Sequence, residues 1–411
     1  MASDDSPALD PLSPAFAWDP YPAYARLRAR PEPVYDPLTD TFLVARFADV
    51  AAIARDPTMV RAPEAVMSPE EVAERRRREN WHDMPFHARF VQFSLLDSDG
   101  PVHDRLRRLV LGWFTPSLMG LQRPAIEAVV DTLVDGFAGG GEIEFIEDVA
   151  ARVPGRVIGR VLGVPDADGP RLRRWSEDIV QFFDVDRSDA RKALAEATTR
   201  EFHDYLVAAL DERRARPRGD VLSRLAAAEA AGRASRDEAI STAMLILMAG
   251  HGSTIDVLGT ALHALLRFPD EMRRLREDPA LAPSAVQEML RFESPLPFFH
   301  RYATRETEVG GRVFPRGTRF GLLYGAANRD PQAFPEPDRF DVGRAPNRHL
   351  AFGGGPHLCL GLHLARLELD VVFTTLLRRF REIAPTGPEP VYKTGLSVRG
   401  LRALPVALRP A

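Results

Sequence analysis

The stretch Phe352-Gly-Gly-Gly-Pro-His-Leu-Cys-Leu-Gly361 contains Cys359, the only cysteine in a chain of 411 residues. Apolar residues recur at helical spacing from there to about Arg381, so the sequence predicts that this cysteine stands at the entrance to a helix. Backbone N–H groups and the positive end of a helix stabilise a thiolate, and glycines let the main chain come close to a flat cofactor. The stretch therefore predicts a thiolate metal ligand.

Two other roles for Cys359 stay open on this pattern. A lone cysteine can be a buried structural thiol, because free cysteine is among the most buried residue types. A cysteine hydrolase would need a base and an orienting partner beside the thiol; His357 is a candidate base, but that role leaves the rest of the motif unexplained. A single cysteine also excludes an internal disulfide, which is compatible with a reducing cytosol.

Composition narrows the class of protein. The chain has 54 basic and 58 acidic residues and a net charge of −4, so no overall positive field attracts nucleic acid. The N-terminal MASDDSPALDPLSP is acidic and broken by proline, unlike a signal peptide. The apolar run 243–249 is far shorter than the about 20 residues of a membrane span. We expect a cytoplasmic monomer that binds neither nucleic acid nor membrane.

The predicted elements are mainly helical. Apolar residues recur at spacings of three and four from about 100 to 295, whereas the stretches near 32–46 and 301–323 are rich in β-branched and aromatic residues typical of small sheets. Residues 1–14 are predicted to form a flexible N-terminus. No repeat, linker or break in composition divides the chain. We therefore predict a single large domain over 1–411, mainly α with small β-sheets.

The stretch 352–361 resembles the haem-binding loop of the cytochromes P-450, the haem-thiolate monooxygenases. Every diagnostic position of the pattern Phe-x-x-Gly-x-His-x-Cys-x-Gly is filled. The resemblance covers nearly the whole chain and implies the P-450 fold and a haem b cofactor, with the Cys359 thiolate as the iron ligand whose electron donation favours O–O cleavage. It also implies that Phe352, His357 and Gly361 bind the cofactor, His357 through a haem propionate.

By the same resemblance, three more side chains bind the propionates. His103 and Arg107 share one face of a predicted helix and could grip one anionic group. Taken alone, this pair would be typical of a solvated basic helix surface. Arg301, which follows Pro297-Phe-Phe-His, occupies another family position for a propionate ligand.

A further family feature is the sequence Glu288-Met-Leu-Arg291, in which opposite charges three residues apart can meet on one helix face. With Arg339 of the sequence Pro-Asp-Arg-Phe, the resemblance implies a buried ion-pair triad of Glu288, Arg291 and Arg339. Removal of one member would strand a buried charge. We therefore assign the triad to folding and not to catalysis.

The long helix that crosses the haem in this family aligns with 245–254, and Ala249 is expected to contact the haem. The acid and threonine of the usual motif are replaced here by Gly252 and Ser253. A glycine inside a helix costs about 1 kcal/mol relative to alanine. Gly250 and Gly252 together therefore indicate an opening or a close approach, although a packing kink would also explain them.

In the family, the acid and the alcohol help to deliver the protons needed for O–O cleavage. Gly252, Ser253 and Thr254 are therefore the expected catalytic positions, with the Ser253 hydroxyl contacting oxygen and Thr254 as its alternative. Asp256 is expected to make a helix–helix hydrogen bond instead. A polar group of the substrate, or water in the space left by Gly252, could relay the protons.

Family position also predicts a substrate pocket with a largely aromatic lining, which suits a hydrophobic or aromatic small molecule. About half of these residues could equally be core. The predicted lining is Phe93, Phe182, Leu245, Met248, Leu296, Phe298 and Leu396, and neighbouring candidates are Trp81, Phe86, Phe90, Phe183 and Phe299. Candidate polar anchors are His82, Arg89, Gln92, Ser94 and Gln181.

The chain has neither a flavin or nicotinamide fingerprint nor the cysteines of an iron–sulfur cluster. Electrons must therefore come from another protein, which the resemblance identifies as a small acidic ferredoxin or flavodoxin. Arg105, Arg108 and Arg366 are candidate contacts for it.

These features favour a soluble bacterial-type monooxygenase that inserts one oxygen atom from O2 into an organic substrate. The altered pair Gly252-Ser253 leaves open a peroxide-driven peroxygenase, or an oxidase that couples, desaturates or decarboxylates its substrate. A non-enzymatic haem-binding sensor is the alternative from another class of function.

Overall fold

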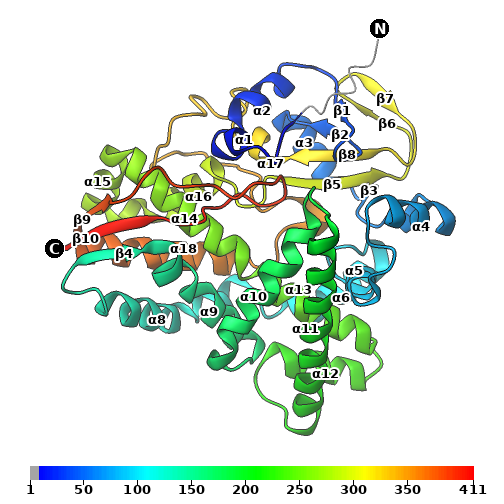
Figure 1. Cartoon of the computed structure of the whole chain (residues 1–411), viewed down its shortest axis with the longest axis horizontal. Helices are drawn as coiled ribbons and strands as arrows, with labels where there is room; N and C mark the ends of the chain where they lie inside the picture. Colours follow the sequence, from blue (N-terminus) through cyan, green and yellow to red (C-terminus); the bar gives the residue numbers. More distant parts are fainter. Residues whose placement is uncertain (1–8) are drawn as a thin grey trace.

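Strands from distant parts of the chain form one five-stranded sheet, in the order β1-β2-β8-β5-β3 (Figure 1). The structure is a computed structural model that describes residues 9–411, so residues 1–8 of the expected flexible N-terminus lie outside the described residues. The strands are β1 (Val34–Asp36), β2 (Thr41–Val44), β3 (Met59–Val60), β5 (Phe298–Ala303) and β8 (Arg319–Leu323).

The pairing of β2 with β8 joins the two stretches that the sequence predicts to be β-rich. These two strands are parallel, with Phe42 opposite Phe320, and the other neighbours in the sheet are antiparallel. The apolar side chains of Val44, Phe320 and Leu322 share one core cluster with α3. Helices α1 (Pro14–Trp18), α2 (Tyr21–Arg28), α3 (Phe47–Arg55) and α17 (Tyr324–Ala327) accompany this sheet.

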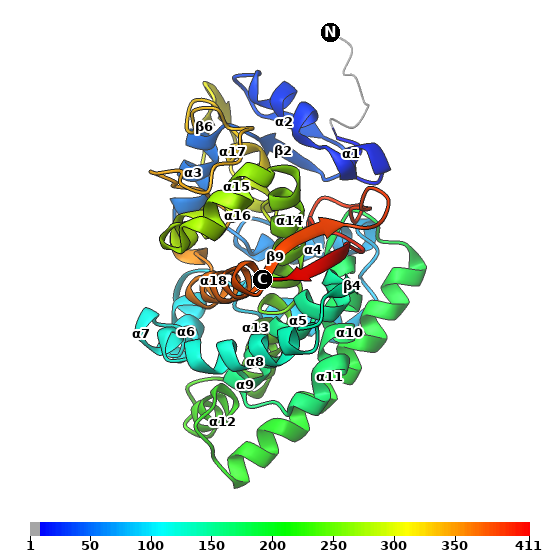
Figure 2. The ribbon, with the colours of Figure 1, turned by 90° about the vertical axis from the view of Figure 1, so that its left-hand side faces the viewer.

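Two smaller sheets complete the β structure. A hairpin pairs β6 (Thr307–Val309) with β7 (Arg312–Phe314). The other sheet has the antiparallel order β4-β10-β9 and lies beside α18 (Leu362–Arg379) in Figure 2. Its strands are β4 (Gly141–Glu144), β9 (Phe380–Pro385) and β10 (Pro405–Pro410). Strand β4 interrupts the stretch from 100 to 295, which the sequence describes as helical throughout.

Helices make up most of the remaining chain, which confirms the predicted class of a mainly α fold with small sheets. Many begin with proline in the first turn, and Ser68 and Ser235 make reciprocal capping boxes. The other α-helices are α4 (Pro69–Arg78), α5 (Pro85–Phe93), α6 (Gly100–Leu111), α7 (Pro116–Gly120), α8 (Arg123–Asp135), α9 (Arg152–Leu162), α10 (Gly169–Val180), α11 (Asp189–Ala215), α12 (Val221–Ala230), α13 (Arg236–Ala249), α14 (Gly252–Arg267), α15 (Pro269–Glu277) and α16 (Ala282–Phe292). Short helical turns are η1 (Pro63–Ala65), η2 (Ile146–Ala150), η3 (Asp166–Asp168), η4 (Gln181–Phe183), η5 (Pro279–Leu281) and η6 (Gly355–His357).

Buried residues of α13 and α14, which follow each other as one interrupted helix, belong to the largest core cluster (Figure 1). By length and composition alone, the span Arg236–Arg267 could cross a membrane, but 72% of its most apolar window is buried inside the protein. Its apolar character is therefore that of a core helix. This interrupted helix and the segment before α18 carry the residues that the sequence singles out.

Candidate functional site

Cys359 lies in the loop between η6 and α18, as the sequence predicts for the entrance to a helix. Its backbone N–H donates to the Phe352 carbonyl at 3.0 Å, and the Leu358 N–H donates to the Gly355 carbonyl at 3.1 Å. Gly361 is the N-cap of α18, which begins at Leu362. The loop is thus fixed by its own backbone hydrogen bonds immediately before the positive end of an 18-residue helix.

The glycine at 355 is required by the packing of this loop on α3. Gly355 has a φ of +63°, and a Cβ placed there would lie 2.6 Å from the Ala54 carbonyl oxygen. A Cβ on Gly361, in contrast, would have no heavy atom within 4 Å outside its own stretch of chain. Contact between two backbones therefore requires the glycine at 355, and the expectation that these glycines serve the approach to a cofactor stays a prediction.

The charges around Cys359 suit a metal-bound sulfur. Burial raises the pKa of the thiol, against the opposing effects of the Gly361 N–H and the guanidinium groups of Arg107 and Arg366. A coordinated metal ion removes the proton from a thiol outright. The site therefore favours a metal thiolate over the free nucleophilic thiolate that a cysteine hydrolase would need.

Three of the four predicted propionate ligands, His103, Arg301 and His357, converge on one buried cluster. The rings of His103 and His357 are 4.5 Å apart between centroids, and His357 Nε2 lies 3.0 Å from Asp99 Oδ1. The buried Nε2 atom of His103 has no hydrogen-bond partner. Burial, together with nearby Arg301 and Arg61, lowers the pKa of His357 to about 4 even though Asp99 opposes the shift.

Arg301 supplies a cation to this cluster, whereas Arg107 lies by Cys359. Burial lowers the pKa of Arg301 to about 10, and its Nη1 donates only to the adjacent His300 carbonyl, at 2.9 Å. Arg107 Nη2 donates to the Leu358 carbonyl at 2.7 Å and so ties α6 to the cysteine loop. A buried guanidinium and an unpartnered imidazole nitrogen are suited to carboxylates, and the residues present therefore fit the propionates of a haem.

Sequence reasoning missed other members of the cluster. Arg61, only 5% exposed, pairs with Asp97 at 2.7 Å, and its backbone N–H donates to Asp99 Oδ2 at 2.7 Å. Tyr324 is buried beside Arg301 and Arg61, whose charges moderate the rise that burial causes in its pKa. Asp99 could have been found from the sequence only by its place immediately before the Gly-Pro start of α6. Arg61 could not, because it reaches the cluster from the end of strand β3 and no local sequence pattern marks it.

The structure corrects the third member of the ion-pair triad. Glu288 is fully buried and accepts from Arg291 Nε at 2.7 Å and Nη2 at 2.8 Å, as predicted. Its second cation, however, is Arg344, whose Nε lies 3.0 and 3.1 Å from the two carboxylate oxygens. The assignment of Arg339 is wrong: its side chain is 57% exposed and pairs with Glu336. The backbone carbonyl of Arg339 instead accepts from Arg291 and Arg344.

The central helix is interrupted between Ala249 and Gly252. The Met248 carbonyl, which would accept from the Gly252 N–H in a continuous helix, receives the Ser176 hydroxyl at 3.3 Å. A Cβ on Gly250 would lie 2.7 Å from Ile158 Cγ1, whereas one on Gly252 would meet only Ser176 Oγ, at 3.7 Å. The predicted close approach is thus confirmed for Gly250. Packing does not require a glycine at position 252, so the face of the helix at Gly252 has room for a side chain or a water molecule.

The open face of the interruption presents Ala249 and Ser253. Ala249 is exposed although Met248 is buried, and Gly252 and Ser253 are half-buried. The Ser253 hydroxyl donates to the Ala249 carbonyl at 2.9 Å. Thr254, the alternative alcohol, is 4% exposed.

The role expected for Asp256 needs a correction. Its carboxylate does not join two helices but accepts from Lys393 Nζ at 2.7 Å, in the chain that follows β9. Burial raises the pKa of Asp256, and Lys393 opposes that rise. An acid already paired with Lys393 is not free to replace the acid missing at Gly252.

The predicted pocket residues divide into two groups. Phe182, Met248 and Leu396 are buried at 1%, 5% and 1% exposure, and each belongs to a packed cluster. They keep little exposed surface, and their assignment to the lining stays a prediction. The four that keep partial exposure are Phe93, Leu245, Leu296 and Phe298.

Among the candidate polar anchors, His82 is exposed and stays a prediction. A second histidine that the sequence did not single out, His87 on α5, is 3% exposed. The His87 ring lies 5.0 Å from Phe183 and 5.4 Å from Phe182 between centroids, and its buried Nδ1 has no hydrogen-bond partner. Burial lowers the pKa of His87 to about 3, so the imidazole is neutral.

The three arginines expected to meet an electron donor do not form one free surface. Both oxygens of Glu238 accept from Arg105. Arg366 is half-buried, with its guanidinium 5.1 Å from the centroid of the Phe352 ring. Of the three, only Arg108 is exposed without a charged partner among residues 9–411.

Comparisons with known proteins agree with this geometry. The family model described as "Cytochrome P450" matches residues 176–403. The chain is 34% identical over 417 residues to "Cytochrome P450 107B1" of Saccharopolyspora erythraea, covering 99% of each chain, and 35% identical over 416 residues to "Cytochrome P450 monooxygenase PikC" of Streptomyces venezuelae, covering 98% and 95%. It superimposes on P450BioI, solved with an acyl carrier protein ligated to hexadec-9Z-enoic acid, at a TM-score of 0.89 with 32% identity, covering 96% and 99%.

Proposed function

Because the chain belongs to the cytochrome P450 family, we propose that it inserts one oxygen atom from O2 into a hydrophobic or aromatic small molecule. The protein is an oxidoreductase of the monooxygenase type, and its cofactor is a haem with a cysteine thiolate as axial ligand. When bound, the haem supplies the activation of O2, in which two electrons and two protons convert one oxygen atom to water while the other enters the substrate.

The observation that carries this proposal is the place of Cys359. Cys359 is half-buried next to the N-terminus of α18, and the loop that holds it is joined to α6 by the hydrogen bond from Arg107 to Leu358. His103, Arg301 and His357 are the proposed propionate ligands, with Phe352, Gly361 and Ala249 against the macrocycle. The carbon monoxide difference spectrum of the reduced protein tests this assignment: a band at the thiolate-haem position supports it, and a failure to take up haem would end it.

Proton delivery is the step in which this chain departs from the family pattern. The hydroxyl of Ser253 has one proton to donate and directs it to the Ala249 carbonyl, so its oxygen is left as an acceptor. Gly252 has no side chain, and the nearest atom on that side is the Ser176 hydroxyl. Protons therefore reach the open face from water in the space beside Gly252 or from a polar group of the substrate, and Ser253 orients the donor.

The ratio of product formed to reductant consumed tests this role. Ser253→Ala is expected to lower the ratio, because the orienting oxygen is lost. Gly252→Glu restores an acid where only Ser176 lies within 4 Å of the new Cβ, and it is expected to raise the ratio. If neither variant changes the rate or the ratio, these positions have no part in proton delivery.

The replacement of the family's acid by Gly252 favours a second candidate function. A peroxide-driven peroxygenase receives its oxygen already reduced, so it needs less proton delivery from the protein; coupling, desaturation and decarboxylation are further outcomes of the same cofactor chemistry. Turnover with peroxide alone, compared with turnover with ferredoxin, reductase and O2, separates these functions. Equal or faster turnover with peroxide would favour the peroxygenase.

His87 is the proposed polar contact for a substrate that is otherwise apolar. A neutral imidazole among aromatic rings can donate or accept one hydrogen bond, which would select a hydroxyl or carbonyl group on the substrate. The solved relative holds a fatty acyl chain on a carrier protein, so a screen should contain both free and carrier-tethered hydrophobic molecules. His87→Phe is expected to weaken the spectral response to polar ligands more than the response to plain hydrocarbons.

The proposed electron donor is a ferredoxin or flavodoxin that docks at the proximal face near Arg108, and the proposed setting is a cytoplasmic monomer. Salt screens attraction between exposed charges. Reduction by the donor should therefore slow as ionic strength rises. A rate independent of salt would contradict docking through this arginine.

A further inference from the structure

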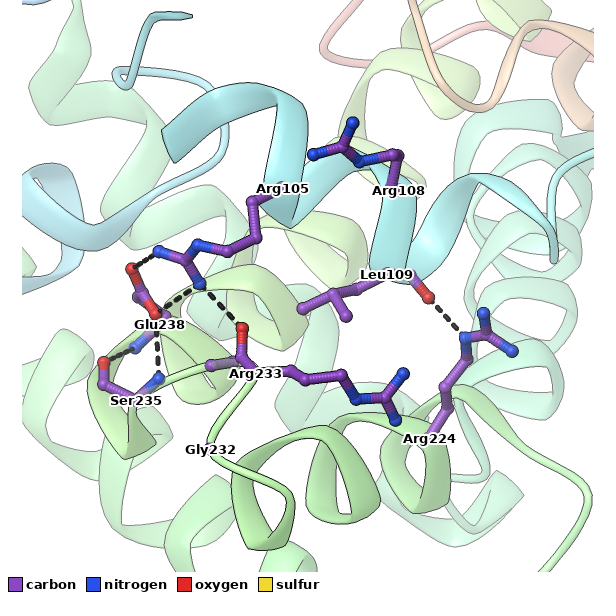
Figure 3. Close-up of a pocket in the computed structure, with 9 residues that line it drawn as sticks. Arg105, Arg108, Leu109, Arg224, Gly232, Arg233, Ser235 and Glu238 are labelled. Atoms are coloured by element: carbon purple, nitrogen blue, oxygen red, sulfur yellow. Dashed lines mark hydrogen bonds and ion pairs between the residues drawn. The ribbon is translucent and has the colours of Figure 1, made fainter. Parts of the chain in front are cut away.

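A basic pocket lies between α6, α12 and the chain that enters α13 (Figure 3). It encloses about 440 Å³, within the range of about 300 to 1,000 Å³ that small-molecule sites occupy. Arg105, Arg108 and Leu109 reach it from one face of α6. The remaining lining comes from Arg224, Gly232, Arg233, Ala234, Ser235 and Glu238.

The positive charges of this basic pocket are not balanced. Glu238 is its only acidic side chain, and both of its oxygens are used by Arg105. Within residues 9–411, the guanidinium groups of Arg108, Arg224 and Arg233 have no carboxylate partner. Four arginines and one glutamate therefore leave a net charge of +3 around one cavity.

Two of the arginines are already oriented. The Nε of Arg224 donates to the Leu109 carbonyl, and Arg105 Nη1 donates to the Arg233 carbonyl at 2.8 Å. Figure 3 shows the Arg233 side chain extending toward that of Arg224, whose terminal nitrogens point away from Arg233. Like charges around one pocket repel each other, and a bound anion would reduce that repulsion.

We propose that this basic pocket binds a small polyanion with two adjacent phosphate groups. The planar, forked donors of arginine match the oxygens of a phosphate, and three free guanidinium groups exceed what one carboxylate can satisfy. The pocket uses positions 105, 108 and 109 of α6, whereas His103 and Arg107 of the proposed haem site face a different side of that helix. The pocket shares Arg108 with the proposed donor surface, but binding of an anion there requires neither the donor nor the haem, so the inference goes beyond the proposed function.

Calorimetric titration of the haem-loaded protein with pyrophosphate tests the proposal. We expect saturable binding of one pyrophosphate per chain, weakened by salt. The double variant Arg108→Ala/Arg233→Ala should bind at least tenfold more weakly. The matched control is Arg273→Ala, an exposed arginine of α15 that pairs only with Asp270, and it should bind as the unaltered protein does.

Adenosine diphosphate in a parallel titration distinguishes a nucleotide site from a site for free diphosphate, because only the former gains affinity from the nucleoside. Either result supports the proposal. The absence of saturable binding, or equal affinity in the double variant and the unaltered protein, would overturn it. Far-UV circular dichroism of the double variant establishes that a loss of binding is not a loss of folding.

Discussion

Replacement of Arg344 by alanine tests the ion-pair network that holds the segment before the cysteine loop. The Arg344 side chain is 10% exposed and contacts both oxygens of the fully buried Glu288. It also donates to the carbonyls of Pro335, Glu336 and Arg339 at 2.7, 3.1 and 2.9 Å. Removal of one partner from a buried ion pair costs about 3–5 kcal/mol, because the remaining charge is uncompensated.

We expect a loss of about 3 kcal/mol in the free energy of unfolding, the lower end of that range, because Glu288 keeps Arg291. The matched control is Arg339→Ala. That arginine is 57% exposed and pairs with a glutamate that is 72% exposed, so its removal should cost less than about 1 kcal/mol.

Urea unfolding of the haem-loaded proteins, followed by tryptophan fluorescence and by Soret absorbance, measures both losses. Arg344→Ala should also release haem at a lower urea concentration, since the segment that it holds leads into the cysteine loop. Equal losses for the two variants, or a larger loss for Arg339→Ala, would refute the reasoning and return the third place in the triad to Arg339.

Three further outcomes are expected. Gly355→Ala should lower the free energy of unfolding by at least about 1–2 kcal/mol, the cost of a left-handed conformation, and should reduce haem retention. The control Gly112→Ala should change neither, because Gly112 has a φ of −59° and open space around it. Equal haem retention in the two variants would contradict the packing on α3. Cys359→Ser should abolish the thiolate band of the carbon monoxide difference spectrum while circular dichroism shows an intact fold; persistence of the band would exclude Cys359 as the ligand. Burial lowers the pKa of His251 and His357 to about 4, so the unfolded chain binds protons first as the pH falls from about 6.5, the ordinary pKa of histidine. The free energy of unfolding should therefore decline between about pH 6.5 and 4, with a smaller decline in His251→Gln; a flat profile between pH 7 and 5 would count against neutral burial.

The cysteine loop could be identified from sequence because its chemistry lies in ten consecutive residues. The same holds for the pair Glu288 and Arg291, whose spacing of three residues places both on one helix face. Arg344 could not be distinguished from Arg339 in this way. Both lie in an irregular Pro-rich segment, where no periodicity indicates which side chain points inward and which turns to solvent.

Clusters formed across the fold were recovered only in part. His103, Arg301 and His357 were found by resemblance, but Arg61 and Asp97 were missed because they come from other segments and share no local pattern. His87 was missed for a related reason. Aromatic residues precede and follow His87 on its helix, so the sequence does not show which way its ring points. Only the packing of α5 against α11 and η4 shows that this histidine is buried.

The sequence by itself determined the cofactor ligand, the mainly helical class and the loss of the usual acid at Gly252, because each of these depends on residue identity within a short segment. Tertiary structure decided that β2 pairs with β8, that Arg344 and not Arg339 neutralises Glu288, and that Arg108, Arg224 and Arg233 surround one cavity. These relations depend on where distant segments pack. Burial then determines whether a charge must find a partner or can remain in water.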